Sequence, residues 1–416
     1  MLNRDGKHAR ITRISMHAVL YSAWAAFGML GLHAANAPAA DGNQLYAFGA
    51  LQKGMGGAGV ASPQDATWAI MNPATLVDLD RRLDFSLETL YVRLSSEPRG
   101  SILASNPFAG EMYAHALVGI PSFGVVWPLP NLTLGAAMIG VAGNRTDYPH
   151  PRATLALFNN ADRRATQELA KIPLAVSHRF DNGWAVGVAV VPSFMKFRTD
   201  SLTLKLHTTN GDNNYSNVYG IGFELGVYRN WDKWAFGACY TTRNCMQRMH
   251  RYEDDLAPGS LDSPQQFQIG LAYRPIEPLE FVADYKWINW NAVNLFGNET
   301  IRGGLYWQNQ HIFKGGVNWH VNDRWTLRSG VSLANRTVTD EAIFANTITP
   351  AMSHMHFALG FSHKLSDQSS VHVTYEQTLP EKHADNGKGD LFSVLGKGTM
   401  ASFEEYSLTV EYSRMF

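Results

Sequence analysis

The sequence carries little charge and only two cysteines. Charged residues make up 17% of the chain and the net charge is −1, which leaves no basic face for nucleic acid and no acidic tail. Cys239 and Cys245 are too few for a disulfide scaffold and lack the spacing of zinc ligands. Their separation is equally compatible with one small local bridge and with two free thiols.

Long apolar runs are also lacking, which excludes a bundle of transmembrane helices. Such a protein shows repeated stretches of about twenty apolar residues, and the one such stretch here lies at the N-terminus. The mean hydropathy is slightly negative, yet the chain is rich in aromatic residues, with 11 Trp, 16 Tyr and 21 Phe, and it has 36 Gly. A transmembrane β-barrel has this composition because its apolar residues alternate with polar ones.

The first 39 residues have the order of a secretory signal peptide. Four basic residues precede an apolar stretch over 18–32, and small residues follow over 33–40. We predict a signal peptide over 1–39, with cleavage after Ala39, because cleavage after Ala37 would place Pro38 first in the mature chain. The alternative is an uncleaved anchor helix, although the apolar stretch is short and interrupted by glycines. The chain is therefore predicted to be exported.

From residue 83 onward, apolar and polar or small residues alternate with a period of two. The clearest segment is 406–416, and the pattern recurs over 184–190, 266–273 and 354–361. Successive side chains of a strand point to opposite faces, so one face suits lipid and the other a polar lumen.

The connections between these segments alternate between two lengths. Six short turn signals lie at 128–131, 181–183, 230–233, 275–278, 322–323 and 366–367, and seven long polar stretches lie near 95–112, 144–169, 199–216, 244–263, 291–309, 335–352 and 381–401. They join fourteen strands. Short turns, long loops and an even strand number predict an all-β, 14-stranded antiparallel transmembrane β-barrel over 83–416, in the outer membrane of a Gram-negative bacterium. A soluble β-sandwich or propeller would not explain the loop asymmetry. The terminal Phe416 resembles the signal read by the barrel assembly machinery.

Residues 40–82 do not alternate, and small residues crowd their middle. Gly54 to Gly59 match the dinucleotide-binding pattern G-x-G-x-x-G, but no strand precedes them and no βαβ unit follows. A compact glycine-rich segment before a barrel is better interpreted as a plug, or hatch, packed inside the lumen. Its small residues would let the backbone approach the wall closely.

At this point the sequence resembles the FadL/TodX family of outer-membrane transporters of fatty acids and aromatic hydrocarbons. The resemblance rests on segment 54–61, on Asp65-Ala66 and on strand-like segments at 263–275, 283–290, 319–330 and 355–375, and it covers nearly all of the mature chain. The residues that match the family's hatch motif are Gly54, Gly56, Gly57, Gly59, Asn72, Pro73 and Ala74.

The resemblance implies a hatch inside a fourteen-stranded barrel that takes up a hydrophobic small molecule, a long-chain fatty acid first. The ligand would enter from outside and leave sideways into outer-membrane lipid, through an opening made by an inward kink of the third strand. That strand is predicted over 132–143, where Gly140 and Gly143 are the kink candidates. The alternative is that both are packing glycines.

The resemblance also suggests where an acidic head group would bind. Lys196 falls at a basic position of the family and Arg198 is nearby, whereas a second basic position finds Gly297. This departure leaves room for uncharged aromatic or aliphatic hydrocarbons, and Lys196 has the alternative of a solvated charge. Five further residues are expected to form a structural ion network facing the lumen, namely Lys314, Arg328, Asp284, Glu376 and Glu411.

Three other functions compete with transport past a hatch. An outer-membrane hydrolase would need a nucleophile context such as Gly-x-Ser-x-Gly, which does not stand out. A plain diffusion porin would not need the glycine-rich segment, and an adhesin would need no ligand path. We therefore predict a monomeric transporter without catalytic residues, cofactor, metal or nucleic-acid partner.

Overall fold

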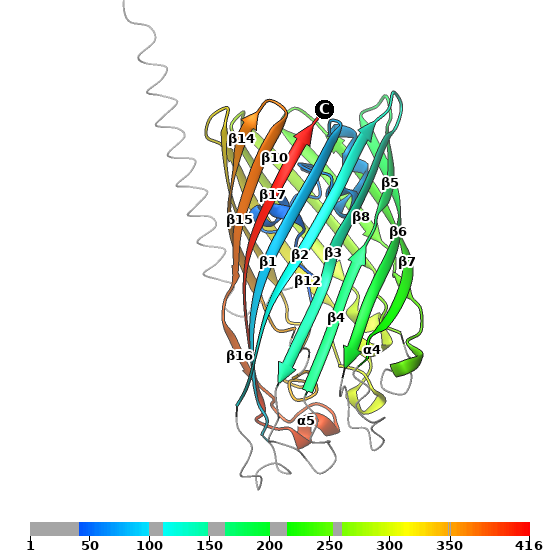
Figure 1. Ribbon diagram of the computed structural model, residues 1–416, viewed down its shortest axis with the longest axis vertical. Coiled ribbons are helices and arrows are strands. Elements are labelled where there is room, and N and C mark those ends of the chain that lie inside the picture. The colour runs from blue at the N-terminus through cyan, green and yellow to red at the C-terminus, as the bar shows by residue number, and fades with distance from the viewer. Residues whose placement is uncertain are drawn as a thin grey trace, which may run out of the picture. The chain divides into compact units, whose positions relative to one another are not determined.

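The protein is described from a computed structural model in which the chain folds into a closed β-barrel (Figure 1). The structure describes residues 41–99, 111–148, 163–199, 214–252, 260–347, 349 and 351–416. The predicted signal peptide lies outside these residues. None of the helices in the described ranges is long and apolar enough to cross a membrane.

Seventeen strand segments form one sheet in which every neighbour is antiparallel. They are β1 (Arg82–Glu97), β2 (Met112–Pro128), β3 (Thr133–Tyr148), β4 (Arg163–Lys171), β5 (Leu174–Arg179), β6 (Trp184–Thr199), β7 (Ser216–Asn230), β8 (Trp234–Thr241), β9 (Cys245–Met246), β10 (Gln266–Ile276), β11 (Leu279–Ile288), β12 (Gln310–His320), β13 (Trp325–Ala334), β14 (Met355–Ser366), β15 (Ser369–Thr378), β16 (Glu381–Ala384) and β17 (Met400–Met415).

Three of these segments, β5, β9 and β16, continue the strands begun by β4, β8 and β15, so the barrel has fourteen strands, as predicted. The first and last strands close it, because β1 pairs with β17 from Arg82↔Met415 to Glu97↔Met400. Closure leaves no free sheet edge at this seam, which a barrel in lipid requires.

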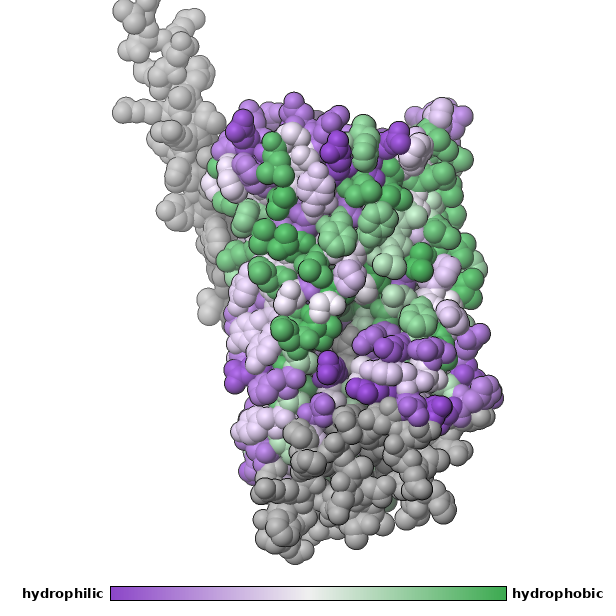
Figure 2. All heavy atoms as spheres, in the orientation of Figure 1, coloured by the Kyte–Doolittle hydropathy of each residue, from purple (hydrophilic) through white to green (hydrophobic). Residues whose placement is uncertain are grey.

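Burial alternates along the strands as the sequence predicted. Leu87, Val188 and Phe223 point outward and are 46%, 52% and 49% exposed, whereas Glu88 and Glu224 point inward and are buried. Apolar side chains cover the middle of the face shown in Figure 2, and hydrophilic ones gather toward both ends. An apolar band of this kind matches the hydrocarbon layer of a membrane.

The two ends of the barrel differ in their connections. All six predicted short turns join strands at one end, the turn end, and the long connections lie at the other, the loop end. Exposed tryptophans such as Trp127, Trp231 and Trp325 mark the turn end. Tyr113, Tyr219 and Phe313 mark the loop end. These two belts correspond to the aromatic girdles at the interfaces of a membrane.

One predicted loop is too long. The sequence suggested a connection over 144–169, but β3 continues to Tyr148 and β4 begins at Arg163. This part of β3 is polar, so its side chains do not show the alternation of a strand. Backbone pairing with β4 holds it in the sheet.

Short helices lie in the loop-end connections, among them α4 (Asn294–Gly297) and α5 (Leu391–Leu395), with the 3-10 turns η2 (His250–Tyr252), η3 (Trp290–Ala292) and η4 (Thr300–Arg302). Of the two open possibilities for the cysteines, the structure has free thiols, with Cys239 buried and Cys245 exposed.

Candidate functional site in the barrel lumen

The lumen is occupied by the N-terminal segment, residues 41–81, drawn in blue inside the barrel in Figure 1. The segment contains α2 (Gly49–Gly54), α3 (Trp68–Met71) and the 3-10 helix η1 (Pro73–Asp78). α2 packs against β13 to β15, β17 and β1, and η1 packs against β3 and β5 to β7. Nearly every residue of the segment is buried. It therefore fills the cross-section of the barrel from opposite sides.

Glycines of the segment lie directly against the wall. Gly56 has a φ of +67°, and a Cβ added there would run into the backbone of Val331. Gly57 and Gly59 also have positive φ, and Gly54 lies against Arg328 and Thr374. Glycine is the residue that adopts this conformation without strain.

The wall has matching glycines that the sequence analysis missed. Added Cβ atoms on seven inward-facing glycines would run into the N-terminal segment, namely Gly124, Gly135, Gly187, Gly226, Gly237, Gly316 and Gly330. The sequence signal was available, because these glycines occupy lumen-side positions of the alternation. Without the position of the segment, however, nothing distinguished them from other strand glycines.

Asn72 ties the segment to the wall at the start of η1. Its Nδ2 donates to the carbonyls of Val60 at 2.9 Å and Val227 at 3.1 Å, and its Oδ1 accepts from Ala74 N at 3.1 Å. Pro73 is the first residue of η1, where its missing N–H costs nothing. The Asn-Pro-Ala motif thus holds a sharp change of chain direction against β7.

Carboxylates of the wall hold backbone N–H groups of the segment. Asp84 accepts from Ala66 N at 2.8 Å, and Glu411 accepts from Ala50 N at 2.7 Å. Asp284 accepts from the N–H groups of Gly59 and Val60 at 2.8 and 2.9 Å. The five residues expected to form an ion network, Lys314, Arg328, Asp284, Glu376 and Glu411, do lie on the inner wall, but in the described residues no ion pair joins any two of them; each binds the N-terminal segment instead.

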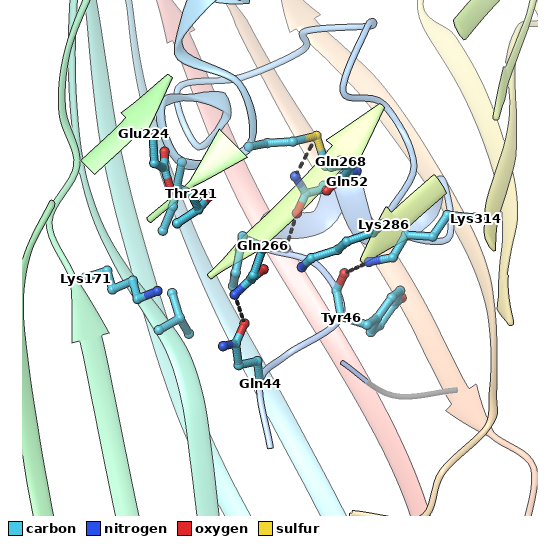
Figure 3. Close-up of a pocket in the computed structure, with 15 residues that line it drawn as sticks. Gln44, Tyr46, Gln52, Lys171, Glu224, Thr241, Gln266, Gln268, Lys286 and Lys314 are labelled. Atoms are coloured by element: carbon cyan, nitrogen blue, oxygen red, sulfur yellow. Dashed lines mark hydrogen bonds between the residues drawn. The ribbon is translucent and has the colours of Figure 1, made fainter. Parts of the chain in front are cut away.

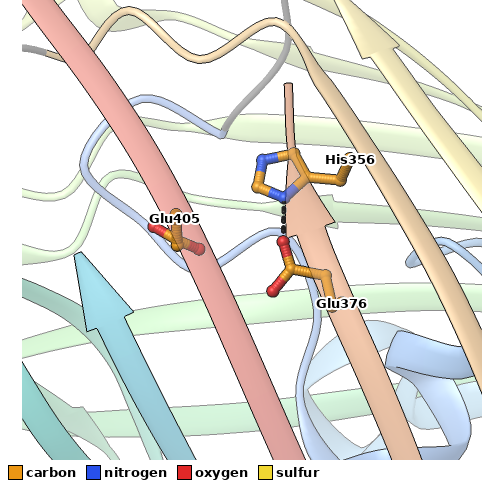
Figure 4. A group of neighbouring side chains, drawn as sticks. All are labelled: His356, Glu376 and Glu405. Carbon is orange, nitrogen blue, oxygen red and sulfur yellow. Dashed lines mark hydrogen bonds and ion pairs between the residues drawn. The ribbon is translucent and has the colours of Figure 1, made fainter. Parts of the chain in front are cut away.

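Lys53 of α2 projects into a cluster of acids. Its Nζ lies 2.6 Å from Glu88 Oε1 and 3.8 Å from Glu376 Oε2. Next to it, His356, Glu376 and Glu405 point toward one another from β14, β15 and β17 (Figure 4), with atoms that could bind a metal ion within 4.8 Å of one another. Because the ammonium of Lys53 already supplies a positive charge to these acids, we assign no metal to the group.

The third strand has an irregularity where the kink was predicted. The pairing of β3 with β4 shifts between Gly140 and Ala142, which leaves Val141 as an extra residue. Val141 and Ala142 are consequently both buried, and Leu45 N donates to Val141 O at 2.8 Å. Gly140 borders this bulge, whereas Gly143 pairs regularly with Glu168.

Beyond the bulge, β2 and β3 are no longer paired with each other. The two strands pair only from Ser122↔Ile139 to Pro128↔Thr133. In the described part of the chain, residues 112–121 of β2 pair with β1 and residues 140–148 of β3 pair mainly with β4, so the two stretches do not pair with each other. We call this unpaired stretch the β2–β3 gap.

An apolar cluster connects the loop end to the bulge. It joins loop-end aromatics such as Trp290, Phe296 and Trp307 to Ile139 and Val141 of β3 in one contiguous set of buried side chains. The cluster also contains Met195, Phe197, Met246 and Met249. Methionine and aromatic side chains form adaptable apolar surfaces.

A small cavity lies between the N-terminal segment and the wall at the level of the bulge (Figure 3). Phe48, Ile70, Met71 and Val141 form its apolar side. Its polar side carries three lysines and several amides, namely Lys171, Lys286, Lys314, Gln44, Gln52, Gln266 and Gln268. Lys286 and Lys314 both bind Asp41, at 2.6 and 3.2 Å. The cavity is thus amphipathic and basic.

The predicted head-group ligands are not in this cavity. Along β6 the odd-numbered residues are buried, whereas Lys196 and Arg198 share the outward face with Val188 and Val190. Their charged groups lie over the ring of Tyr215, at 4.0 and 4.6 Å from its centre. The structure therefore does not support the predicted role of these two residues inside the lumen. Gly297 ends α4 in a loop-end connection.

Comparisons with known proteins agree with this architecture. The profile of the family described as outer membrane protein transport protein (OMPP1/FadL/TodX) matches residues 31–411. Structurally, the toluene transporter TodX of Pseudomonas putida superposes with a TM-score of 0.67 at 16% identity, covering 91% of this chain and 100% of its own. A FadL homologue of Pseudomonas aeruginosa gives 0.67 at 13% identity over 92% and 100%.

The toluene transporter TbuX of Ralstonia pickettii gives a TM-score of 0.59 at 16% identity, covering 89% of this chain and 99% of its own. No curated protein sequence matches this one. The structural likeness establishes the fold, and the profile establishes the family. The chain belongs to the OMPP1/FadL/TodX family of outer-membrane transport proteins, which are channels and not enzymes.

Proposed function

We propose that this member of the family takes up hydrophobic small molecules, long-chain fatty acids first, and releases them sideways into the outer membrane through the β2–β3 gap. One observation carries the proposal. The apolar cluster that begins among the loop-end aromatics reaches Val141, which lines the cavity and lies beside the β2–β3 gap. An apolar ligand on this route would reach lipid without crossing the aqueous periplasm.

In this proposal the N-terminal segment, with predicted bounds 40–82, acts as the hatch. It fills the lumen below the cavity, so a ligand cannot continue straight through. Leu45 donates to Val141 O, and Gln44 forms an isolated bridge with Ala142. A movement of residues 41–48 would therefore break contacts at the bulge and enlarge the cavity toward the β2–β3 gap.

The basic side of the cavity favours an acidic amphiphile over a neutral ligand. A buried positive charge gains from an anionic partner in a medium of low polarity. Neutral hydrocarbons are the second candidate, because two of the solved relatives are toluene transporters. In addition, neither of the two basic positions of the family supplies a charge to the cavity, since Lys196 faces outward and the other position is Gly297.

A disulfide across the β2–β3 gap tests lateral release. A Cβ built on Gly140 lies 3.9 Å from the Cβ of Ile120, within the range that a disulfide spans. The double variant Ile120→Cys, Gly140→Cys, in a Cys245→Ser background, should lose fatty-acid uptake when oxidised and regain it when reduced. The single-cysteine variants are the controls. Equal uptake by the oxidised and reduced double variant would rule out this exit.

A further inference from the structure

We propose that Lys171 and Glu224 form a head-group site in the lumen cavity and that Lys171 makes the transporter selective for acidic amphiphiles over neutral hydrocarbons. This inference rests on the proposed function, because it assigns specificity to the cavity on the transport route. The two residues face the cavity from β4 and β7, on the same side of it (Figure 3).

Lys171 is a buried cation without a direct partner. It ends β4, is 4% exposed, and among the described residues its ammonium makes neither a hydrogen bond nor an ion pair within 4.0 Å. The two other lysines of the cavity differ, because Lys286 and Lys314 both donate to Asp41. A buried ammonium that lacks an acceptor is costly. The ammonium of Lys171 is therefore positioned to bind an acceptor that enters the cavity.

Glu224 is the acid that faces Lys171, and one of its carboxylate oxygens also lacks a hydrogen-bond partner. The residue is 1% exposed. Its Oε1 accepts from Thr241 at 3.4 Å, whereas its Oε2 has no hydrogen-bond partner. The charges of the two residues attract each other, but no direct bond joins them. Glu224 therefore acts as a positioning residue that keeps the empty site close to neutral without blocking the ammonium.

The charges around the cavity differ in whether they have a direct partner. Lys286 and Lys314 bind Asp41, and Asp284 faces Lys314, whereas Lys171 has no acceptor within bonding distance among the described residues. A carboxylate would give the ammonium of Lys171 the acceptor that it lacks, whereas an alkane or an aromatic hydrocarbon leaves it without one. A site with an unpaired polar group discriminates strongly against a ligand that cannot pair it.

The apolar side of the cavity gives the ligand an orientation. Phe48, Ile70 and Met71 lie on the N-terminal segment, and Val141 lies at the bulge of β3. With the head group at Lys171, the tail would rest on these side chains and extend toward the β2–β3 gap. Binding and release are then linked, because the tail would leave first and the head group would follow.

The test compares an acid with a neutral molecule of the same length. Purified wild type and Lys171→Met are titrated with a long-chain fatty acid and with the matching n-alkane, by displacement of a fluorescent probe. Loss of a charge-assisted hydrogen bond should weaken binding of the acid by about ten- to one-hundred-fold and should not weaken binding of the alkane. Lys171→Arg should keep the preference for the acid, and Glu224→Gln should strengthen binding of the acid.

Lys196→Met is the matched control, because it removes a lysine from the outward face of β6. Equal binding of the acid by Lys171→Met and wild type would overturn the inference, and so would an equal loss of acid and alkane. Heat-modified mobility on gels verifies that each variant forms a barrel. Because these assays measure binding, a failure of the disulfide test would overturn lateral release and leave the head-group site standing.

Discussion

Replacing Lys53 by methionine should loosen the N-terminal segment while leaving the barrel intact. Lys53 is fully buried, and its ammonium lies between Glu88 and Glu376. Burial lowers the pKa of Lys53, but the two glutamates outweigh this effect and raise it above 10.5. The side chain is therefore charged at neutral pH, and methionine keeps its length while removing the charge.

We expect a large loss of the free energy that holds the N-terminal segment in place, because the buried glutamates keep their charge without a partner. Removing one member of a buried ion pair costs about 3–5 kcal/mol, since the other charge is left uncompensated. At about 1.4 kcal/mol for each factor of ten, the population in which α2 has left the wall should rise by a factor of about 10² to about 4 × 10³. The barrel strands keep their mutual pairing, which does not involve Lys53.

Planar-bilayer recording measures this change directly. The wild type should show rare openings, and Lys53→Met should show frequent ones. Adding Glu88→Gln should restore part of the seal, because the amide removes one unpaired charge. Lys382→Met is the control, since its side chain is 50% exposed. Channels of Lys53→Met that stay closed as long as the wild type, or no recovery in the double variant, would refute this reasoning.

Three further predictions concern the same seal. Gly330→Val should raise bilayer conductance by overpacking the contact with Gly56, which costs about 1–3 kcal/mol, whereas Gly119→Val on the outward face of β2 should not. Asn72→Ala should cost about 2–4 kcal/mol of seating free energy and should expose the segment to limited proteolysis; unchanged cleavage rates would contradict this. Burial and the neighbouring Asp84 raise the pKa of Asp65 to about 6. The seated segment therefore holds a proton that the free segment releases near 3.8, so seating weakens as pH rises from about 4 to 6, and Asp65→Asn should remove this part of the pH dependence of channel opening.

The barrel was predictable from sequence because one local rule repeats along it. Alternation over 184–190 or 406–416 indicates that one face of the strand contacts lipid, and the length of a connection indicates at which end of the barrel it lies. The same rule would have placed Lys196 correctly. Val186, Val188 and Val190 face lipid, so Lys196, an even number of residues further on, faces outward too. The alternation therefore places Lys196 on the outward face of β6, whereas the resemblance to the family pointed to a head-group ligand.

The site residues were harder to predict from the sequence, because their positions depend on contacts between distant segments. Lys171 directly follows the stretch interpreted as a long loop, so its inward direction was hidden. The bulge at Val141 depends on the pairing of β3 with β4, which no property of Val141 reveals. Gly140 could be predicted as a kink candidate because glycine is common at β-bulges. The glycine does not indicate that Val141 is the unpaired residue of the bulge.

The N-terminal segment is held unevenly, and this bears on how the route opens. Residues 51–79 contribute to two apolar clusters with the wall, and wall carboxylates hold their backbone as well. Residues 41–48 bury fewer apolar side chains, namely Leu45, Tyr46, Ala47 and Phe48, and are also held by polar contacts such as those of Asp41 with two lysines. An anionic ligand can take the place of Asp41 at the two lysines, whereas exposing the apolar clusters of residues 51–79 costs about 25 cal/mol for each Å². Displacing residues 41–48 alone is therefore the less costly way to open the cavity, and it leaves the remainder of the lumen sealed while a ligand passes.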